Sequence, residues 1–175
     1  MLDFKKYDSK RIGILGLGMT GQSIFNSLSQ SKAEIFLWDD NVSIREKSLY
    51  CHEKIKNIND WPWGRLDYFF PSPGVDLKKN FYSEKLKKYK TKLMSDISLF
   101  EEARGSVFPS GTLIAITGTN GKSSTAIMLY EILKSEGRDV RLGGNIGIPI
   151  LSLEPGTNQT IYIVCLLYTS DAADD

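Results

Sequence analysis

The sequence contains few of the residues on which metal centres and disulfide-linked folds depend. Two cysteines, Cys51 and Cys165, and one histidine, His52, occur in 175 residues. Two thiols cannot build a disulfide framework or a four-cysteine zinc site, and one imidazole cannot build a histidine metal centre. We therefore expect a protein of the reducing cytoplasm.

The sequence also lacks long apolar runs and an excess of either charge. The longest apolar stretch, 161–168, is far too short to cross a bilayer, and the charged start of the chain does not resemble a secretory signal. Its 22 basic and 21 acidic residues leave a formal net charge of +1. The lysines at 85–90 are typical of a solvated helix face. We expect no membrane insertion and no nucleic-acid partner.

What the sequence does contain is the pattern of a nucleotide-binding α/β fold. A short apolar run at 12–15 leads into the glycine-rich turn GLGMTG at 16–21, and the apolar spacing after it predicts a helix from Met19. A second strand is expected at 35–38, ending in Asp39. We expect a helix and loops at 42–59, and then a strand at 68–70 that is closed by Pro71 to Gly74. A further helix and strand are expected within 86–93. A helix is expected at 96–103, with Asp96 as its capping residue.

The strand and helix pattern begins again after a break at 105–111. A strand at 113–116, a second glycine-rich turn and a helix that ends at Gly137 follow in order. Two such units predict a Rossmann-like N-terminal domain with a parallel sheet, followed by the start of a P-loop-type ATP-binding α/β domain. We expect the first domain at 1–96 and the second at 97–164.

The first glycine turn has the features of a site for a phosphorylated ligand. Gly16 and Gly18 allow a tight bend and a close approach of the backbone to a ligand, while Gly21 lets the helix pack closely on the strand. Asp39 follows roughly 20 residues later, where dinucleotide folds carry an acid that accepts hydrogen bonds from a sugar or base. A lone pattern of this kind also fits a purely structural turn, or a nicotinamide-dependent dehydrogenase.

The second turn, TGTNGKSS at 117–124, is the stronger signal. Gly118, Asn120 and Gly121 allow several backbone N–H groups to converge on one phosphate. Lys122 can then reach the outer phosphates of a nucleoside triphosphate, and the Ser123 hydroxyl can bind Mg²⁺. A nicotinamide-dependent dehydrogenase would leave this turn without a role.

These segments together resemble the Mur ligase superfamily, the ATP-dependent amide-forming ligases of peptidoglycan precursor synthesis and their folylpolyglutamate synthase relatives. The similarity rests on AITGTNGKSS at 115–124, GLGMTG, the SPG at 72–74, DISLFEEA at 96–103 and GGNIG at 143–147. The form of the first turn is that of the branch that adds D-glutamate to UDP-N-acetylmuramoyl-L-alanine. Members that add L-alanine have a longer glycine-rich start, and those that add the third residue lack this turn.

The resemblance implies two substrate sites and a reaction. The first turn would hold the diphosphate of a UDP-sugar, with Asp39 close to the uridine, and Lys122 would act on the ATP phosphates. Phosphoryl transfer from ATP would form an acyl phosphate, which the amino group of D-glutamate attacks, in a cytoplasmic protein that we expect to be monomeric. The residues implied for the UDP-sugar are Gly16, Leu17, Gly18, Met19, Thr20, Gly21, Asp39, Ser72, Pro73, Gly74 and Asn145. Those implied for ATP are Gly118, Thr119, Asn120, Gly121, Lys122, Ser123 and Ser124, with Ser123 also on Mg²⁺.

The chain departs from the family after Val164. The family continues with a magnesium-binding glutamate, whereas this chain has CLLYTSDAAD from Cys165, which resembles the translation of a transposon-end adapter used in sequencing libraries. We therefore expect 165–175 to be a non-native tail on a truncated second domain, and no turnover from the chain alone. Two other possibilities stay open, another amino-acid adder of the superfamily and a non-catalytic UDP-sugar-binding module.

Overall fold

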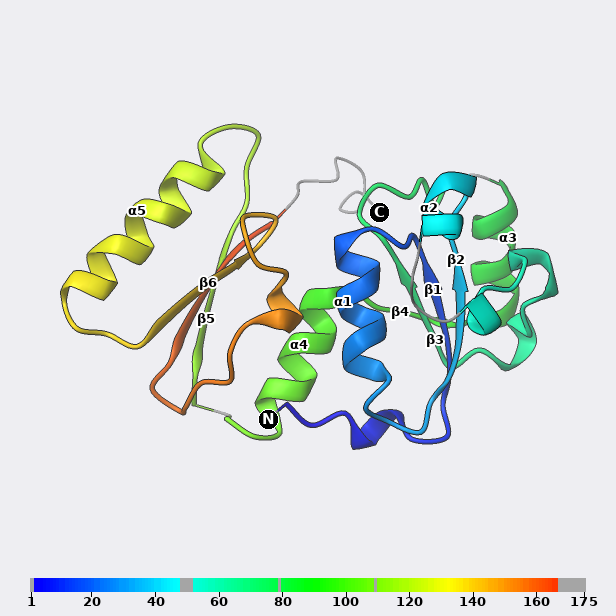
Figure 1. Ribbon diagram of the computed structural model, residues 1–175, viewed down its shortest axis with the longest axis horizontal. Coiled ribbons are helices and arrows are strands. Elements are labelled where there is room, and N and C mark those ends of the chain that lie inside the picture. Colours follow the sequence, from blue (N-terminus) through cyan, green and yellow to red (C-terminus); the bar gives the residue numbers. More distant parts are fainter. Residues whose placement is uncertain (1, 48–51, 79, 109, 167–175) are drawn as a thin grey trace. The chain divides into compact units, whose positions relative to one another are not determined.

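The computed structural model describes residues 2–47, 52–78, 80–108 and 110–166 (Figure 1). The chain divides into two compact units at the junction of Leu99 and Phe100. The first unit is Phe4–Leu99, and the second continues from Phe100 and includes Asp3, whose amide donates to the Ala103 carbonyl at 3.5 Å. The predicted domain limits, 1–96 and 97–164, stay a proposal, because a compact unit is not by itself an independent domain. Most of the predicted tail, 167–175, lies outside the described residues.

A parallel sheet of four strands forms the first unit, in the order β2–β1–β3–β4. The strand bounds are β1 (Arg11–Leu15), β2 (Glu34–Trp38), β3 (Tyr68–Pro71) and β4 (Lys92–Leu93), and the helices are α1 (Met19–Leu28), α2 (Val42–Lys47) and α3 (Asn80–Tyr89). The predicted Rossmann-like parallel arrangement is confirmed. Because all four strands run in one direction, the turns that follow β1, β2 and β3 gather at the same edge of the sheet.

The two faces of this sheet are covered differently, with α1 on one face and α3 on the other (Figure 1). Ile14 lies on the α1 face, because its Cγ2 is 3.7 Å from the position that a Cβ at Gly21 of α1 would take. On the opposite face Leu15 and Phe69 join a cluster that contains Trp61 and Trp63, whose ring centroids are 5.7 Å apart. Gly13 is required here, because a Cβ at this position would lie 2.3 Å from the Trp61 ring. The cluster thus provides a rigid base beneath the strand ends.

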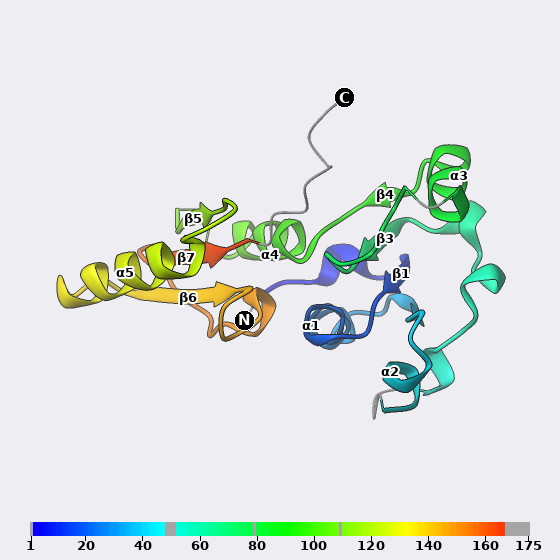
Figure 2. The same ribbon diagram turned by 90° about the horizontal axis from the view of Figure 1, so that it is seen from above.

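The second unit contains a three-stranded parallel sheet in the order β5–β7–β6 (Figure 2). The strands are β5 (Thr112–Ile116), β6 (Val140–Gly144) and β7 (Ile161–Cys165), and the helices are α4 (Asp96–Gly105), which begins in the first unit, and α5 (Lys122–Ser135). On one face Ala126 of α5 packs with Ile163 of β7. On the other face Phe100 of α4 meets Tyr162 edge-on, with ring centroids 5.0 Å apart. The central strand β7 is therefore the best-buried strand of this unit.

The outer strand β5 and the outer surface of α5 are poorly covered. None of the five residues of β5 is buried. Ile127, Met128 and Ile132 of α5 are exposed by 44%, 64% and 53%. The apolar residues at 113–116 therefore lack full cover. Among the helices of the described ranges, none has the length and apolar character needed to cross a membrane.

Two local details differ from the sequence predictions. Ser95 caps α4 one residue earlier than expected, because its hydroxyl accepts from the Ser98 amide at 3.1 Å. Pro71 is the last residue of β3, paired with Leu15, rather than the residue that closes the strand. A proline is tolerated at the end of a strand because few ladder bonds remain to be made there. By contrast, the helix predicted within 42–59 is confirmed, since α2 occupies the first part of that range.

The residue after α3, Lys90, adopts a left-handed conformation with a φ of 53°. Because a side chain is strained in this conformation and glycine is not, Lys90→Gly should raise the free energy of unfolding by about 0.5–1 kcal/mol. Urea denaturation of the chain measures this change. The matched control is Glu84→Gly at an exposed position in the middle of α3, which should lower the free energy of unfolding by about 1 kcal/mol. A loss of stability in both variants would contradict the assignment.

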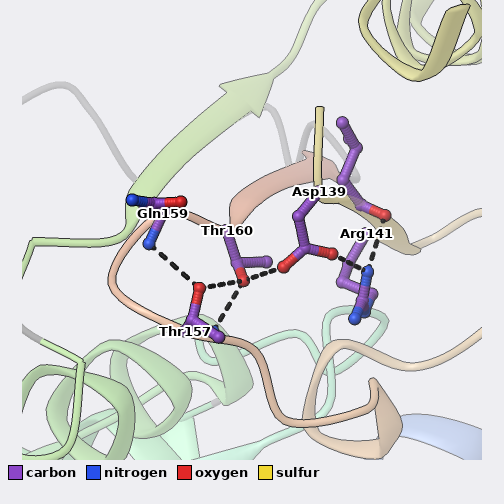
Figure 3. A network of polar contacts seen from close by, with 6 residues as sticks. Asp139, Arg141, Thr157, Gln159 and Thr160 are labelled. Carbon is purple, nitrogen blue, oxygen red and sulfur yellow. Dashed lines mark hydrogen bonds and ion pairs between the residues drawn. The ribbon is translucent and has the colours of Figure 1, made fainter. Parts of the chain in front are cut away.

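A polar network joins the starts of β6 and β7 (Figure 3). The fully buried Thr160 hydroxyl donates to the Asp139 carboxylate and accepts from the Thr157 amide at 2.7 Å. Arg141 donates to the other carboxylate oxygen of Asp139. The hydrogen bond from Thr160, and then the charge and hydrogen bond of Arg141, lower the pKa of Asp139. The network therefore fixes the register of the two strands through an ionised carboxylate.

Thr160→Val should lower the free energy of unfolding by about 1 kcal/mol at neutral pH, because it removes the hydrogen-bond partner of the Thr157 amide and of the partly exposed Asp139 carboxylate. The Asp139 carboxylate contributes fully above its ordinary pKa of 3.8 and loses its contribution as the pH falls through the lower folded value. The difference between wild type and variant should therefore shrink below about pH 4. Urea midpoints from pH 7 to pH 3 test this, with Thr125→Val on the exposed face of α5 as the control. If the stability difference between wild type and Thr160→Val did not change with pH, the Asp139 carboxylate would not be the group through which Thr160 acts.

Candidate functional site

The three glycines of the first turn differ in how strictly the surrounding atoms require a glycine. Gly16 has a φ of +95°, and a Cβ there would lie 2.4 Å from the Ser72 Oγ. A Cβ at Gly21 would lie 1.8 Å from the Gly16 carbonyl oxygen, so α1 meets the turn with no space for a side chain. Gly18, the N-cap of α1, has open space around it. The geometry accounts for a tight bend at Gly16 and close packing at Gly21, and the expected approach of a ligand to the turn stays a prediction.

An open pocket of about 460 Å³ lies at the carboxyl ends of β1, β2 and β3. It brings together seven of the residues predicted for the UDP-sugar, which are Gly16, Gly18, Met19, Thr20, Asp39, Ser72 and Gly74. Leu17 is buried beneath the turn, and Gly21 packs behind it. Pro73 is not part of the pocket wall, and Asn145 belongs to the second unit.

Five further residues line the pocket that the sequence did not single out, namely Leu15, Asp40, Asn41, Val75 and Asp76. Each lies within two positions of a predicted residue, so closeness to the end of a strand was a signal that could have found them. The wall contains the three carboxylates of Asp39, Asp40 and Asp76 but no lysine or arginine. An anionic ligand in this pocket must therefore be held by backbone N–H groups and hydroxyls, which a helix N-terminus and a glycine turn supply.

The side wall of the pocket is held by a cluster of aromatic and charged side chains. The Asp40 carboxylate accepts from the Trp38 indole at 3.0 Å and from the Tyr82 hydroxyl at 3.1 Å. Burial, followed by the charge of Asp40, raises the pKa of Tyr82 to about 12, so the hydroxyl stays a donor at physiological pH. The Arg45 guanidinium lies 4.2 Å from the Trp38 ring centroid. These contacts fix the tip of β2 against α3.

The second glycine turn joins β5 to α5 in the manner of a phosphate-binding loop. Gly118 and Gly121 have φ values of +144° and +74°, which favour glycine. The Lys122 Nζ folds back over the loop and donates to the carbonyls of Gly118 and Thr119. Thr119, Asn120, Ser123 and Ser124 are exposed around it. All seven residues predicted for ATP therefore lie in one open turn at the start of a helix of 14 residues.

The residues present fit a magnesium ion only in combination with phosphate oxygens. The exposed Ser123 hydroxyl is a hard oxygen ligand of the kind Mg²⁺ prefers. Within the described ranges, no group of three or more His, Cys, Asp or Glu side chains could hold a metal ion. Ser123 could thus supply one ligand, with the nucleotide supplying others.

The GGNIG turn lies at the same edge of the second sheet as the phosphate-binding turn, because β5, β7 and β6 are parallel. Gly144 and Gly147 have φ values of +99° and +70°. The Asn145 backbone amide donates to the Cys165 carbonyl at 2.8 Å, and the residue is exposed. Cys165 ends β7, in register with both Ile116 and Gly144. Cys165 therefore lies at the centre of this edge.

Comparison with known proteins gives a consistent set of relatives. The chain is 34% identical over 165 residues to a UDP-N-acetylmuramoylalanine–D-glutamate ligase of Wolbachia pipientis, covering 93% of this chain and 31% of the relative. It is 33% identical over 177 residues to the enzyme of that name from Mesorhizobium japonicum, covering 99% of this chain and 38% of the relative. The chain thus spans about a third of the length of the curated relatives it matches.

Solved structures and family models add less. A murein peptide ligase from Psychrobacter arcticus is 19% identical, with a TM-score of 0.45, over 90% of this chain and 37% of that one. A UDP-N-acetylmuramate:L-alanyl-gamma-D-glutamyl-meso-diaminopimelate ligase from Neisseria is 14% identical with a TM-score of 0.44, covering 89% and 52%. No family model matches the chain.

Proposed function

Because the chain belongs to the Mur ligase superfamily, we propose that its two units bind the two phosphorylated substrates of a peptidoglycan-precursor ligase. The pocket of the first unit would take UDP-N-acetylmuramoyl-L-alanine, and the turn between β5 and α5 would take ATP. The whole ligase would join the L-alanyl carboxylate to D-glutamate. The observation that carries the proposal is the pair of glycine turns, each at a strand-to-helix junction, in a chain that matches D-glutamate ligases over almost its full length.

The chemistry assigned to the first unit is binding and orientation. The amides of the turn at Gly18 to Thr20, at the N-terminus of α1, would hold the diphosphate. The uridine would lie near the end of β2, and the Ser72 to Gly74 turn would close the opposite wall. Since the wall carries carboxylates and no lysine or arginine, these amides and hydroxyls would supply the attraction for the diphosphate.

The chemistry assigned to the second unit is charge neutralisation during phosphoryl transfer. Lys122 would leave the carbonyls of its own loop and bind the outer phosphates, stabilising the charge that develops as the phosphoryl group moves to the substrate carboxylate. Mg²⁺, when bound, would neutralise further negative charge on those phosphates, with the Ser123 hydroxyl as one ligand. The amino group of D-glutamate would then attack the acyl phosphate, forming the amide bond and expelling inorganic phosphate, so no protein nucleophile is needed.

Calorimetric titration of the chain tests this assignment. We expect binding of UDP-N-acetylmuramoyl-L-alanine and of ATP with MgCl₂, no binding of NAD, and no ligation by these 175 residues alone. NAD binding without UDP-sugar binding would overturn the proposal in favour of a dehydrogenase. Tighter binding of UDP-N-acetylmuramate, or of the UDP-sugar dipeptide, than of the L-alanyl compound would instead indicate another amino-acid adder of the superfamily.

A further inference from the structure

Positive charge is concentrated on α3 and β4 of the first unit. Residues 78–92 contain seven of the 22 basic residues of the chain, all of them lysines, and a single acid, Glu84. This segment therefore has a net charge of +6 in a chain whose total is +1, so the remaining residues sum to −5. Five of these lysines follow one another from α3 to β4, and we call them the lysine strip: Lys85, Lys87, Lys88, Lys90 and Lys92.

Ammonium groups of the lysine strip lie over aromatic rings. The Nζ atoms of Lys85 and Lys88 lie 6.0 and 5.1 Å from the ring centroid of Tyr89, so two like charges share one ring. The Lys92 Nζ lies 5.7 Å from the ring centroid of Tyr68, its neighbour in the sheet. Contacts of this kind hold an ammonium group in place without neutralising its charge. Part of the strip is therefore a set of positive charges in fixed positions.

Lys90 carries its side chain in a backbone conformation that favours glycine. Its φ is 53°, and because the residue is exposed, its side chain is not part of the core. Lys85 and Lys88 also repel each other, since residues three apart on a helix are neighbours. Both features lower the stability of the folded chain. Strain and repulsion that the core does not require are typical of a functional surface, whereas the sequence pattern alone is typical of a solvated helix face.

The composition of the strip favours an anionic bilayer over other anionic partners. Arginine and exposed aromatic faces bind nucleic acids, but 78–92 contains no arginine, and Phe81 and Tyr89 are half-buried against the core. Lysine is depleted in protein–protein interfaces. By contrast, a cluster of about four to eight basic residues on a helix is typical of a site for anionic lipid headgroups.

The apolar residues around the strip fit contact with a bilayer surface without insertion. The apolar face of α3 is already covered, because Phe81, Leu86 and Tyr89 pack against the core cluster of the first unit. Leu93, which follows the strip, is 49% exposed. It belongs to β4, the edge strand of the sheet (Figure 2). The strip therefore meets a bilayer with its lysines, and Leu93 adds one apolar contact.

We propose that the lysine strip adsorbs the first unit to the surface of a bilayer that contains anionic phospholipids. Each ammonium group is attracted by the negative surface potential, which acts within about 10 Å of the headgroups at about 0.1 M salt. This inference goes beyond the proposed function and does not depend on it. None of the five lysines lines the pocket, so their replacement should leave UDP-sugar affinity unchanged.

Co-sedimentation of the full chain with vesicles of phosphatidylglycerol and phosphatidylcholine in equal parts tests the proposal. Wild type should bind these vesicles at low salt and should be released by about 0.5 M NaCl. Lys87→Gln combined with Lys88→Gln should weaken binding about 30-fold, since each lysine near the surface contributes about fivefold. The matched control is Lys32→Gln combined with Lys47→Gln, which removes the same charge from exposed positions elsewhere in the first unit. The control should weaken binding by less than about threefold.

Lys90→Gly separates binding by the strip from its effect on folding. This variant should raise the free energy of unfolding, as stated above, and yet weaken vesicle binding about fivefold. A residue with a purely structural role would not change stability and binding in opposite directions. If the double variant of Lys87 and Lys88 did not fold, Lys90→Gly and the salt dependence of wild type would decide.

Four outcomes would overturn the proposal. The first is no wild-type binding to the mixed vesicles, or equal binding to vesicles of phosphatidylcholine alone. The second is an equal loss in the two double variants, which would show a response to net charge. The third is vesicle binding by Lys90→Gly as tight as that of wild type. The fourth is tighter binding to single-stranded poly(U) than to the vesicles, which would assign the strip to a nucleic acid. Sedimentation without vesicles corrects for self-association of the chain.

Discussion

Gly21→Ala is expected to lower the free energy of unfolding of the first unit by about 3 kcal/mol and to weaken UDP-sugar binding at least about 100-fold. The added Cβ would lie 1.8 Å from the Gly16 carbonyl oxygen and 2.9 Å from the Gly16 carbonyl carbon. Both are backbone atoms, so no side-chain rotation relieves the overlap. The turn must move away from α1, and the amides at Gly18 to Thr20 lose their common direction. Urea denaturation and calorimetric titration with UDP-N-acetylmuramoyl-L-alanine measure the two effects.

Gly18→Ala is the matched control within the same turn. Gly18 has a φ of −68°, which any residue adopts, and no heavy atom lies within 4 Å of the position that its Cβ would take. Its stability should change by less than about 1 kcal/mol. Because Gly18 lines the pocket, the methyl group should still weaken UDP-sugar binding, by about tenfold. If Gly21→Ala matched Gly18→Ala in stability, close packing of α1 on the turn would not be the role of Gly21.

Lys122→Ala is expected to weaken ATP binding in the presence of MgCl₂ by about 100-fold, which corresponds to about 2.7 kcal/mol, and to leave UDP-sugar binding within about twofold. The ammonium group is half-buried over the loop and bonded to the carbonyls of Gly118 and Thr119, so it stands beside the amides that would take the phosphates. Without the ammonium group, only the dipoles of the backbone amides would stabilise the negative charges of the phosphates. Titration of the same protein preparation with each ligand gives both affinities.

Lys134→Ala is the control for a general effect of charge on this helix. Lys134 lies in the last turn of α5, about 18 Å along the axis from Lys122 at 1.5 Å per residue, with its ammonium 5.1 Å from the Tyr130 ring centroid. Its removal alters the net charge equally but should change ATP affinity by less than about twofold. Equal losses in both variants would indicate long-range electrostatics. No loss in Lys122→Ala would remove the lysine from the proposed phosphoryl transfer.

The elements that sequence patterns predicted well are those with strong local signals. Strands β1, β2 and β5, and helices α1 and α5, are marked by apolar runs or helical spacing and by glycine turns between them. Strand β6 was missed, because its sequence, VRLGG, is short and ends in two glycines that disfavour a strand. It forms because Leu142 and its neighbours pair along the full length of β7. A strand held by its partner leaves little trace in its own sequence.

The candidate site shows the same division between local and tertiary information. The predicted residues of the first turn, of Asp39 and of the SPG segment do gather at one pocket, because the carboxyl ends of parallel strands meet. Asp40 and Asp76 were not predicted to line it, since nothing in their local sequence shows which side of a turn they occupy. The partners of Asp39 were equally hidden. A carboxylate at this position is typical of a ligand contact, and only coordinates reveal that its two oxygens also accept from the Leu17 and Asn41 amides.

The uncovered side of β5 and α5 has a practical consequence for every measurement suggested above. Ile127, Met128 and Ile132 present apolar surface beside a strand whose outer backbone groups have no neighbouring strand in the sheet. Two copies of the chain can pair along this edge of the sheet, because an exposed edge strand offers unpaired backbone groups. Light scattering of the chain should therefore rise with protein concentration, and a charged substitution such as Met128→Lys should suppress that rise while both ligand affinities stay as they were.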